Sequence, residues 1–469
     1  MQQQPDTALT RTQSRDMTWH LHGQSYVSMS ERTAPMVIVR GEGVHVWDET
    51  GRKYLDAMSG VGNATLGYSE TRLIEAASRQ LRRLPFQHTF GNRTTEKTAE
   101  LAERLVQLAP SPMAKAFFAC SGSEANDSAI MLAWYYWRAL GQPARRKILS
   151  HRRAYHGSTV ATASLTDYSN LQQPFSAPLP GFVHVRCPDH YREGQPGESE
   201  YAFSERLAAE LEETITREGP ETVAAFFIEP VMGLGGILVP PAGYAEKIQS
   251  VLRRHGILVV ADEVVSGFGR TGNFWGCESV GLQPDMLVCS KGLTAGYMPM
   301  SALMLSEEVC DALRHNPSIP FGHGFTQSGN PVSAAVALET LDIYEERGLV
   351  AQARSMGERL AVGLRALGSH PLVGDVRGTG TMWAVELVAD KRTRAPFDPA
   401  WGIGFLAVQF AQSQGVLVRM VGDCLVTLPP LITGTAEVER IIETLGSAID
   451  HAAEIATALR EKSPQLCAQ

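Results

Sequence analysis

Short apolar runs alternate with amphipathic helical patterns along the middle of the chain. From about Arg72 onward the strand-like runs are AKAFFACS, RKILSHR, FVHVRC, AAFFIEPV, ILVVADEV, MLVCSK and SALMLS. The segments between them, such as SEANDSAIMLAWYYWRAL and YAFSERLAAELEETITREG, repeat their apolar residues with the period of a helix. Strands that alternate with helices favour an α/β fold, in which a largely parallel sheet is covered by helices on both faces.

The two ends of the chain carry different patterns. Near the N-terminus, MVIVRGEGVHVWDETGRKYLDAMSG has short alternating runs separated by turn residues, which predicts a small antiparallel sheet. After Pro331 a long helical stretch is followed by strand-like pieces and by a closing helix to about Arg460, which is a mixed α+β pattern. We therefore expect a disordered N-terminus over 1–16, the first part of a small domain over 17–70, a large domain over 71–330 and the rest of the small domain over 331–469.

The composition narrows the class of protein. The 469 residues exceed what one hydrophobic core usually organises. A hydrophobic content of 44% is ordinary for a soluble protein, and a net charge of -8 argues against a nucleic-acid binder. No apolar run approaches the roughly 20 residues needed to cross a bilayer, and the polar start MQQQPDTALTRTQSRDMTWH lacks the apolar segment of a signal peptide. We expect a cytoplasmic protein without nucleic-acid or membrane partners.

The cysteines and histidines give no metal-binding pattern. The seven cysteines form no C-x-x-C pair and most lie in apolar surroundings, which predicts reduced, buried thiols. The 13 histidines show no H-x-x-x-H or similar ligand spacing. No metal site is therefore predicted.

Unusual residues follow five of the predicted strands, and ligands of open α/β sheets collect beyond the carboxyl ends of the strands. After AKAFFAC, the residues Ser121, Gly122 and Ser123 open a helix. The free N–H groups and the dipole of such a helix N-terminus favour a phosphate. A simple serine N-cap, with Glu124 in the first turn, explains the same residues equally well.

Three further strand ends carry polar or aromatic residues. Asp262 and Glu263 follow ILVVA, and an acidic pair there is costly unless it meets a cation or a metal; the alternatives are a helix cap or a partner for Arg270. Glu229 follows AAFFI, and the next proline ends that strand. Tyr155 precedes a histidine and a glycine after RKILSHRRA, a pair that on its own more often serves packing.

A lone lysine stands between two apolar runs in PDMLVCSKGLTAGYMPMSALML. Lysine is almost never fully buried without a partner, so Lys291 needs a chemical reason for its place. The five strand ends together supply a phosphate cradle, an aromatic plate, a buried acid and a buried lysine. A pyridoxal phosphate enzyme uses this set: the lysine forms an imine with the aldehyde, and the acid keeps the pyridine nitrogen protonated. Pyridoxal 5'-phosphate is therefore the expected cofactor.

The motif series SGSEAND, YHG, IEPVMGLGGILVPP, VVADEVVSGFGRTG, SKGLTAGYMP and GFTQSGNPVSAAVALETL resembles that of the class III (omega) aminotransferases, most closely their amine–pyruvate branch. The similarity runs from about Met17 to the C-terminal helix. It implies the fold type I of pyridoxal phosphate enzymes and a homodimer, or a dimer of dimers, with active sites at the subunit interface. The implied activity is a ping-pong transfer of an amino group from a primary amine or amino acid to a keto acid such as pyruvate.

The resemblance assigns cofactor-binding residues by position. Lys291 matches the Schiff-base lysine and Asp262 the partner of the pyridinium nitrogen; these two are the expected catalytic residues. Glu229 matches a carboxylate that supports the cofactor network. Tyr155 and Val264 match the residues on opposite faces of the cofactor ring.

The phosphate contacts implied by the resemblance come from both subunits. Gly122 and Ser123 match the phosphate-binding pair of SGSEAN. Thr326, in GFTQSG, matches a residue that reaches the phosphate of the neighbouring subunit's cofactor.

The resemblance also assigns substrate-binding residues. Arg419 in VLVRMVGD matches a mobile arginine that pairs with a substrate carboxylate, Phe90 and Arg93 match positions lining the partner's pocket, and Tyr155 borders the substrate. Gly62 departs from the family, because close relatives commonly carry a tryptophan there. A tryptophan covers about 150–250 Å² of surface, so its absence is expected to admit a bulkier amine. Alternatively, Gly62 serves a turn and a neighbouring side chain fills the space.

Other functions share parts of this pattern. Aminomutases, racemases and decarboxylases use the same fold and lysine, whereas Arg419 and the lack of an appended domain favour amino transfer. A nicotinamide-dependent dehydrogenase or a non-catalytic binding protein has the same α/β alternation. The glycine clusters GLGG and RGTG, however, lack the strand-to-helix context of a G-x-G-x-x-G motif.

Overall fold

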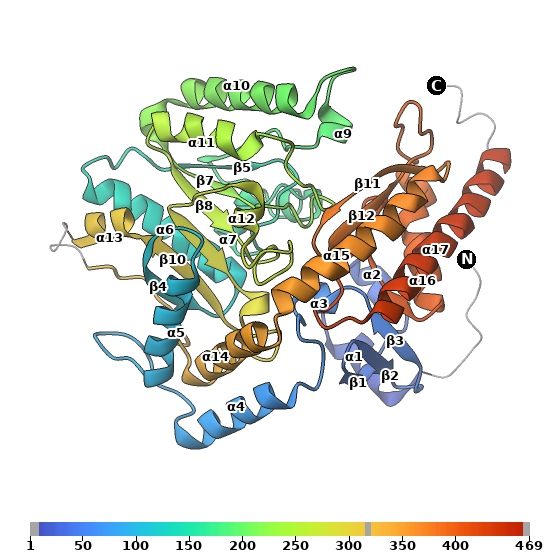
Figure 1. Ribbon diagram of the computed structural model, residues 1–469, viewed down its shortest axis with the longest axis horizontal. Helices are drawn as coiled ribbons and strands as arrows, with labels where there is room; N and C mark the ends of the chain where they lie inside the picture. The colour runs from blue at the N-terminus through green and yellow to red at the C-terminus, as the bar shows by residue number, and fades with distance from the viewer. Residues whose placement is uncertain (1–8, 315–319, 463–469) are drawn as a thin grey trace.

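A computed structural model describes residues 9–314 and 320–462 (Figure 1). Its largest element is a seven-stranded sheet with the order β4-β10-β9-β8-β7-β5-β6. The strands are β4 (Met113–Ala119), β5 (Lys147–His151), β6 (Phe182–Val185), β7 (Val223–Ile228), β8 (Leu258–Asp262), β9 (Met286–Cys289) and β10 (Ser301–Ser306). Of these, β10 is antiparallel to both of its neighbours, and the pairs of β5 to β9 are parallel. The predicted mainly parallel sheet is confirmed.

Successive residues of the central strands point into different cores. In β8, Leu258 and Val260 belong to one core cluster and Val259 and Ala261 to another, as the two-residue period of a strand requires. The first of these cores includes residues of α6 (Gly122–Ala139), α7 (Val160–Leu165) and α13 (Glu307–Arg314). The second includes residues of α4 (Thr71–Arg83), α5 (Glu96–Leu108), α10 (Glu200–Glu218), α11 (Tyr244–Arg254), α12 (Gly276–Val280) and α14 (Pro331–Glu346). Both faces of the sheet are therefore buried.

Two four-stranded sheets form the smaller part of the molecule. The first has the order β1-β2-β3-β13 and joins both ends of the chain: β1 (Ile38–Glu42), β2 (His45–Asp48), β3 (Lys53–Asp56) and β13 (Val416–Leu417). The second has the order β11-β12-β15-β14: β11 (Val373–Thr379), β12 (Met382–Leu387), β15 (Cys424–Thr427) and β14 (Arg419–Val421). The predicted N-terminal antiparallel sheet is confirmed by the pairing of β1, β2 and β3.

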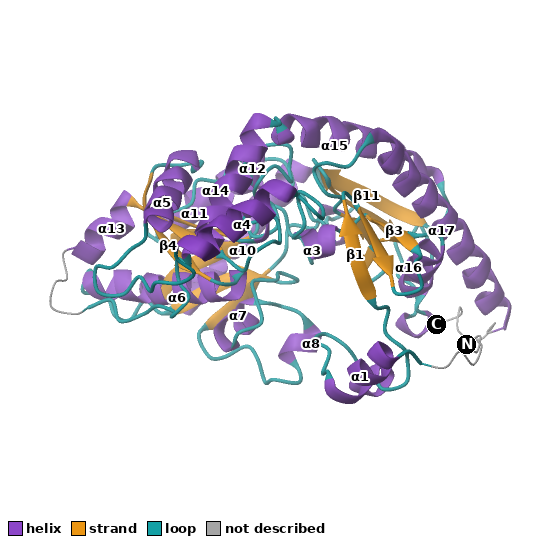
Figure 2. Ribbon diagram, turned by 90° about the horizontal axis from the view of Figure 1, so that it is seen from below, coloured by secondary structure: helices purple, strands orange, loops and turns teal. Residues whose placement is uncertain are grey.

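Long helices flank the small sheets (Figure 2). They are α15 (Leu349–Ala366), α16 (Ile403–Ser413) and α17 (Thr435–Lys462), and they share a core with these strands. The predicted long helical stretch after Pro331 is two helices, since Gly348 separates α14 from α15 with a φ of +59°. The predicted boundary at Pro331 stays a prediction; α14 shares the core of the large sheet and packs on α4 and α5, and α15 contributes residues to both cores.

Short helices occur in the connections: α2 (Val27–Ser30), α3 (Ser59–Gly62), α8 (Ser169–Gln172) and α9 (His190–Glu193). Near the N-terminus the structure differs from the predicted disorder over 1–16, because α1 (Arg11–Trp19) already begins at Arg11. A capping box between Thr10 and Gln13 starts this helix, and the Thr10 hydroxyl donates to Glu49 at 2.9 Å. The first eight residues lie outside the described ones. Within the described part of the chain, no helix has the length and apolar character to cross a membrane.

Candidate active site

A cavity of about 550 Å³ lies beyond the carboxyl ends of the parallel strands. Residues of the large sheet line one side, and α3, β14 and β15 of the small sheets line the other. The structure brings together eight of the residues expected from the sequence: Gly122, Ser123, Tyr155, Glu229, Asp262, Val264, Lys291 and Arg419. This placement agrees with the expected gathering of residues beyond the strand ends, and the roles of these residues stay predictions.

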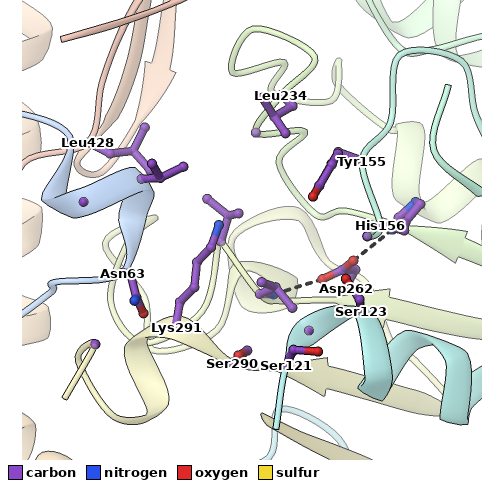
Figure 3. Close-up of a pocket in the computed structure, with 18 of the residues that line it drawn as sticks. Asn63, Ser121, Ser123, Tyr155, His156, Leu234, Asp262, Ser290, Lys291 and Leu428 are labelled. Carbon is purple, nitrogen blue, oxygen red and sulfur yellow. Dashed lines mark hydrogen bonds and ion pairs between the residues drawn. The ribbon is translucent and has the colours of Figure 1, made fainter. Parts of the chain in front are cut away.

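Lys291 stands at the centre of the cavity, with its side chain extending into it (Figure 3). It lies two residues after the end of β9, and its backbone is left-handed, with φ at +44°. Such a conformation costs a non-glycine residue about 1–2 kcal/mol, so the surrounding fold must hold it in place. Burial lowers the pKa of the amine to about 8, although the charges of Asp262 and Glu229 act in the opposite direction. A sizeable share of neutral, nucleophilic amine is thus present near neutral pH.

Asp262 ends β8 and is only 4% exposed. Its Oδ2 accepts hydrogen bonds from Asn126 Nδ2 at 2.7 Å and from His156 at 2.9 Å, where Nδ1 carries the proton (Figure 3). Its Oδ1 accepts from the N–H of Val264 at 3.1 Å. Three donors therefore fix the direction of this carboxylate at the cavity wall.

The neighbouring acid, Glu263, faces away from the cavity. Its carboxylate accepts from the hydroxyl of Ser266 at 2.6 Å and from the N–H groups of Gly276 and Cys277 at 2.9 and 2.6 Å, so it caps α12. The helix-cap interpretation thus holds for Glu263, whereas Asp262 serves the cavity. Arg270 is not the partner of either, because its guanidinium donates to backbone carbonyls instead.

Glu229 is a second buried acid in the cavity wall. It accepts from the N–H of Tyr155 at 3.1 Å and from that of Gly233 at 2.8 Å. Burial, reinforced by the charge of Asp262, raises the pKa of Glu229 to about 7, and His156 opposes the shift. Glu229 therefore holds its proton more readily than an exposed glutamate and orients the backbone at Tyr155.

The N-terminus of α6 opens into the cavity; the structure shows the serine cap, and the phosphate site stays a prediction that the geometry is compatible with. Ser121 is the N-cap and accepts from the N–H of Glu124 at 3.2 Å. Gly122 and Ser123 occupy the first helical positions, whose N–H groups have no partner within a helix. A Cβ on Gly122 would lie 3.0 Å from a methyl group of Val264, so only glycine fits here without a shift. N–H groups suited to an anion and a serine cap therefore coexist.

These donors fit the expected cofactor group by group. The helix N-terminus suits its phosphate, the fixed carboxylate of Asp262 suits a protonated ring nitrogen, and the amine of Lys291 suits its aldehyde. Tyr155 and Val264 line the space between these groups. No part of this donor set conflicts with pyridoxal phosphate.

Four of the expected residues do not line this cavity. Phe90, 45% exposed, borders a separate hollow beside α5 and β4, and Arg93 and Thr326 are exposed on the surface of the single chain. Gly62 is buried behind the wall, with a φ of +78°. A Cβ on Gly62 would lie 3.4 Å from Leu428 Cδ2 and 4.0 Å from Lys291 Cδ, which would place a side chain beside the lysine.

Sequence reasoning missed two residues that hold Asp262. Asn126 lies four residues after Gly122 and therefore on the same face of α6, a spacing that was visible in SGSEAND. His156 was seen only as the neighbour of Tyr155. A third residue, Arg270, is 1% exposed and donates to the carbonyls of Pro429, at 2.5 Å, and of Gly62, at 3.3 Å. It thereby ties the large domain to the small sheets, a contact without any local signal.

Comparison with known proteins agrees with this geometry. The sequence model of the aminotransferase class-III family matches residues 26–449. A gamma-aminobutyrate transaminase 3 of Solanum lycopersicum is 46% identical over 88% of this chain and 80% of its own length, and a vanillin aminotransferase of Capsicum frutescens is 44% identical over 88% and 91%. Among solved structures, an omega transaminase from Pseudomonas jessenii in complex with PMP has a TM-score of 0.94 and 45% identity, covering 96% of this chain and 99% of that one. A thermostable omega transaminase variant with a tryptophan-to-glycine replacement, engineered for the synthesis of bulky amines, also has a TM-score of 0.94 and 45% identity, over 95% and 100%.

Proposed function

The chain belongs to the class III aminotransferases, the pyridoxal phosphate-dependent transaminases of fold type I, and from that premise we propose that it moves an amino group from a primary amine without an α-carboxylate to an α-keto acid such as pyruvate. One observation carries this proposal: the guanidinium of Arg419 lies in the wall of the cavity that holds Lys291, free of any ion pair to a described residue. A free guanidinium there is suited to the carboxylate of a keto acid. The relative named for γ-aminobutyrate supports a donor other than an α-amino acid, and the relative named for vanillin, an aldehyde without an amino group, supports a reaction partner that lacks an α-carboxylate.

When bound, pyridoxal phosphate supplies the carbonyl that takes up the amino group and a ring that accepts the electron pair of a broken C–H bond. Lys291 Nζ binds the cofactor and, as a neutral amine with a pKa of about 8, accepts the proton from the substrate carbon and returns it. Asp262 orients and charges the ring nitrogen, while the N-terminus of α6 holds the phosphate. Tyr155 and Val264 confine the ring between them.

A second copy of the chain completes the site in this proposal. Phe90, Arg93 and Thr326 are exposed in the single chain and lie outside its cavity, although the family resemblance gives all three a role beside a cofactor. A homodimer, or a dimer of dimers, explains how exposed residues can have this role, because each chain then supplies them to the active site of its partner. Sedimentation of the purified protein tests this directly, and a monomer with full activity would contradict it.

The space near Gly62 favours bulky amines in this proposal. A Cβ at this position would be in ordinary contact with Leu428 and would lie 4.0 Å from Lys291 Cδ, so a large side chain there would add bulk beside the lysine that glycine omits. The engineered tryptophan-to-glycine relative supports this interpretation, since it was made for bulky amines. The φ of +78° supports the alternative that Gly62 serves the turn of α3, although Val61, with a side chain, has a similar φ of +65°.

An amine-donor screen with pyruvate as acceptor tests the proposed function. Small amines, bulky arylalkyl amines, γ-aminobutyrate and α-amino acids are each incubated with the holoenzyme and pyruvate, and the alanine formed is measured. We expect alanine from amines that lack an α-carboxylate, and an increase of the Michaelis constant for pyruvate of about tenfold or more in Arg419→Ala, because losing a hydrogen bond to a charged group costs about 1.5–3 kcal/mol. Turnover confined to α-amino acids, or an unchanged Michaelis constant, would contradict the proposal.

A further inference from the structure

Among the described residues, the side-chain partner of Arg419 is Gln24, which does not line the cavity. Nη2 of Arg419 donates to Oε1 of Gln24 at 3.5 Å, across 395 positions of sequence. Within residues 9–314 and 320–462 its guanidinium forms no ion pair with a carboxylate. The arginine therefore lies between the cavity, which it lines, and a neutral acceptor on the N-terminal segment.

The position of Gln24 is held by the fold of residues 9–33, which we call the N-terminal strap. Gln24 has a left-handed backbone with φ at +53°, uncommon for a residue other than glycine. Asp16 ties the preceding turn to α1: its Oδ1 accepts from His20 Nδ1 at 2.8 Å and its Oδ2 from His22 Nε2 at 2.6 Å. The helix itself is anchored to the turn between β2 and β3 through its N-cap. The segment that precedes Gln24 is thus tied to α1, and α1 is tied to the turn between β2 and β3.

The hydrogen bond between Arg419 and Gln24 is weak enough to be replaced by a bond to a substrate. A distance of 3.5 Å is at the long limit of a hydrogen bond, and the acceptor is a neutral amide. The Gln24 contact already has a charged donor, but a substrate carboxylate adds a negative charge and can accept two parallel N–H bonds from the guanidinium, so it competes well for Arg419. A substrate without a carboxylate offers no such partner, and an unpaired charge among the apolar lining residues, such as Leu234 and Leu428, is unfavourable.

We propose that Gln24 is a specificity-determining residue: it holds the guanidinium of Arg419 aside while a carboxylate-free amine reacts, and yields it when a keto acid enters. The inference rests on the proposed role of Arg419 in binding the keto-acid carboxylate. A glutamine suits the task because it offers a hydrogen-bond acceptor without a charge. Gln24 acts through Arg419 and is therefore a positioning residue.

The test measures the two half-reactions of the holoenzyme separately by absorbance, one with a carboxylate-free amine and one with pyruvate. Gln24→Glu places a competing carboxylate beside Arg419, and an exposed ion pair of about 1 kcal/mol raises the apparent dissociation constant for pyruvate up to about fivefold. The apparent dissociation constant for the amine and the maximal rates of both half-reactions stay within twofold of the wild-type values. Ser28→Glu adds the same charge to the exposed surface of α2 and leaves both constants unchanged.

Removing the hydrogen-bond acceptor at position 24 is expected to affect the dissociation constant for the amine instead of the one for pyruvate. Gln24→Ala leaves the guanidinium without its outer partner, so the apparent dissociation constant for the amine rises while that for pyruvate stays equal or falls. Gln24→Glu placed on Arg419→Ala changes neither constant further, because the residue on which it acts is gone. If Arg419→Ala weakens pyruvate binding but the Gln24 variants match Ser28→Glu, this inference is wrong and the proposed function stands. If Arg419→Ala itself leaves pyruvate binding unchanged, the proposed function fails first.

Discussion

Replacing Gly62 by tryptophan tests whether the missing side chain sets the width of the substrate space. The change has two separable effects. Any residue other than glycine at a φ of +78° carries about 1–2 kcal/mol of backbone strain. The tryptophan side chain, covering about 150–250 Å², adds bulk beside Lys291 in a cavity of about 550 Å³. Only the second effect distinguishes a bulky from a small amine.

Gly62→Ala is the matched control, because its Cβ meets Leu428 at an ordinary 3.4 Å and introduces the strain without the bulk. Overpacking costs about 1–3 kcal/mol, which corresponds to a loss of about 5- to 150-fold in kcat/KM for the bulky amine. The small amine gains apolar contact with the indole, so its kcat/KM stays equal or rises. The Gly62→Ala variant lowers kcat/KM for both amines by the same factor.

The assay measures kcat/KM for isopropylamine and for a bulky arylalkyl amine, with saturating pyruvate, in the wild type and both variants. The decisive quantity is the ratio of kcat/KM for the bulky amine to kcat/KM for the small amine, because the effect of the common backbone strain cancels in this ratio. A ratio in Gly62→Trp equal to that in Gly62→Ala would refute the wide-pocket proposal and leave Gly62 as a turn residue. Cofactor absorbance of each variant shows that the site is still assembled.

Three further outcomes are expected. Lys291→Ala abolishes turnover while the folded protein still holds cofactor without a covalent bond, and turnover near that of the wild type would contradict the assignment. In the wild type, the rate at which the apoenzyme captures pyridoxal phosphate rises with pH through about 8, because the neutral amine of Lys291 reacts. A midpoint near 10.5 would show that burial does not lower the pKa of this amine. Asp262→Asn slows the amine half-reaction by at least tenfold with an unchanged far-ultraviolet spectrum, since an amide cannot keep the ring nitrogen charged, and a rate near that of the wild type would give that role to another group. Arg270→Met leaves the carbonyls of Pro429 and Gly62 without their donor and lowers the unfolding free energy by about 2–3 kcal/mol in denaturation of the holoenzyme, whereas an unchanged or higher stability would show that the cost of burying the charge outweighs its bonds.

The chemistry of the site was predictable from the sequence because it depends on local features. Asp262 ends one short apolar strand and Lys291 lies two residues after another, and parallel strands place their carboxyl ends at one edge of the sheet. A polar residue after an apolar run is visible in the sequence without any knowledge of distant contacts. The same logic identified Glu229 and Tyr155, and the helix that opens at Gly122.

The residues that hold these groups in place were harder to predict, because their partners are distant in sequence. A pairing of Arg270 with the nearby acids was one alternative offered by the sequence, yet Arg270 binds carbonyls 158 and 159 positions later, in the chain segment after β15. The polar segment from Thr10 to Trp19 shows no apolar period, so its helix was missed; a capping box and a contact with Glu49 stabilise it. The Gln24–Arg419 contact spans almost the whole chain.

The residues expected to carry out the reaction and those expected to select the substrate lie in different parts of the fold. Lys291 and Asp262, the expected catalytic residues, are held by the buried large sheet, where most substitutions disturb packing. Arg419 belongs to β14, which lines the cavity from the other side; Gly62 lies in α3 just behind that wall, and Gln24 lies in the N-terminal strap, which contacts Arg419. A change on that side alters the space or the charge offered to the substrate and leaves the lysine and its acid untouched. Amine specificity can therefore diverge among class III transaminases while the reaction itself stays the same.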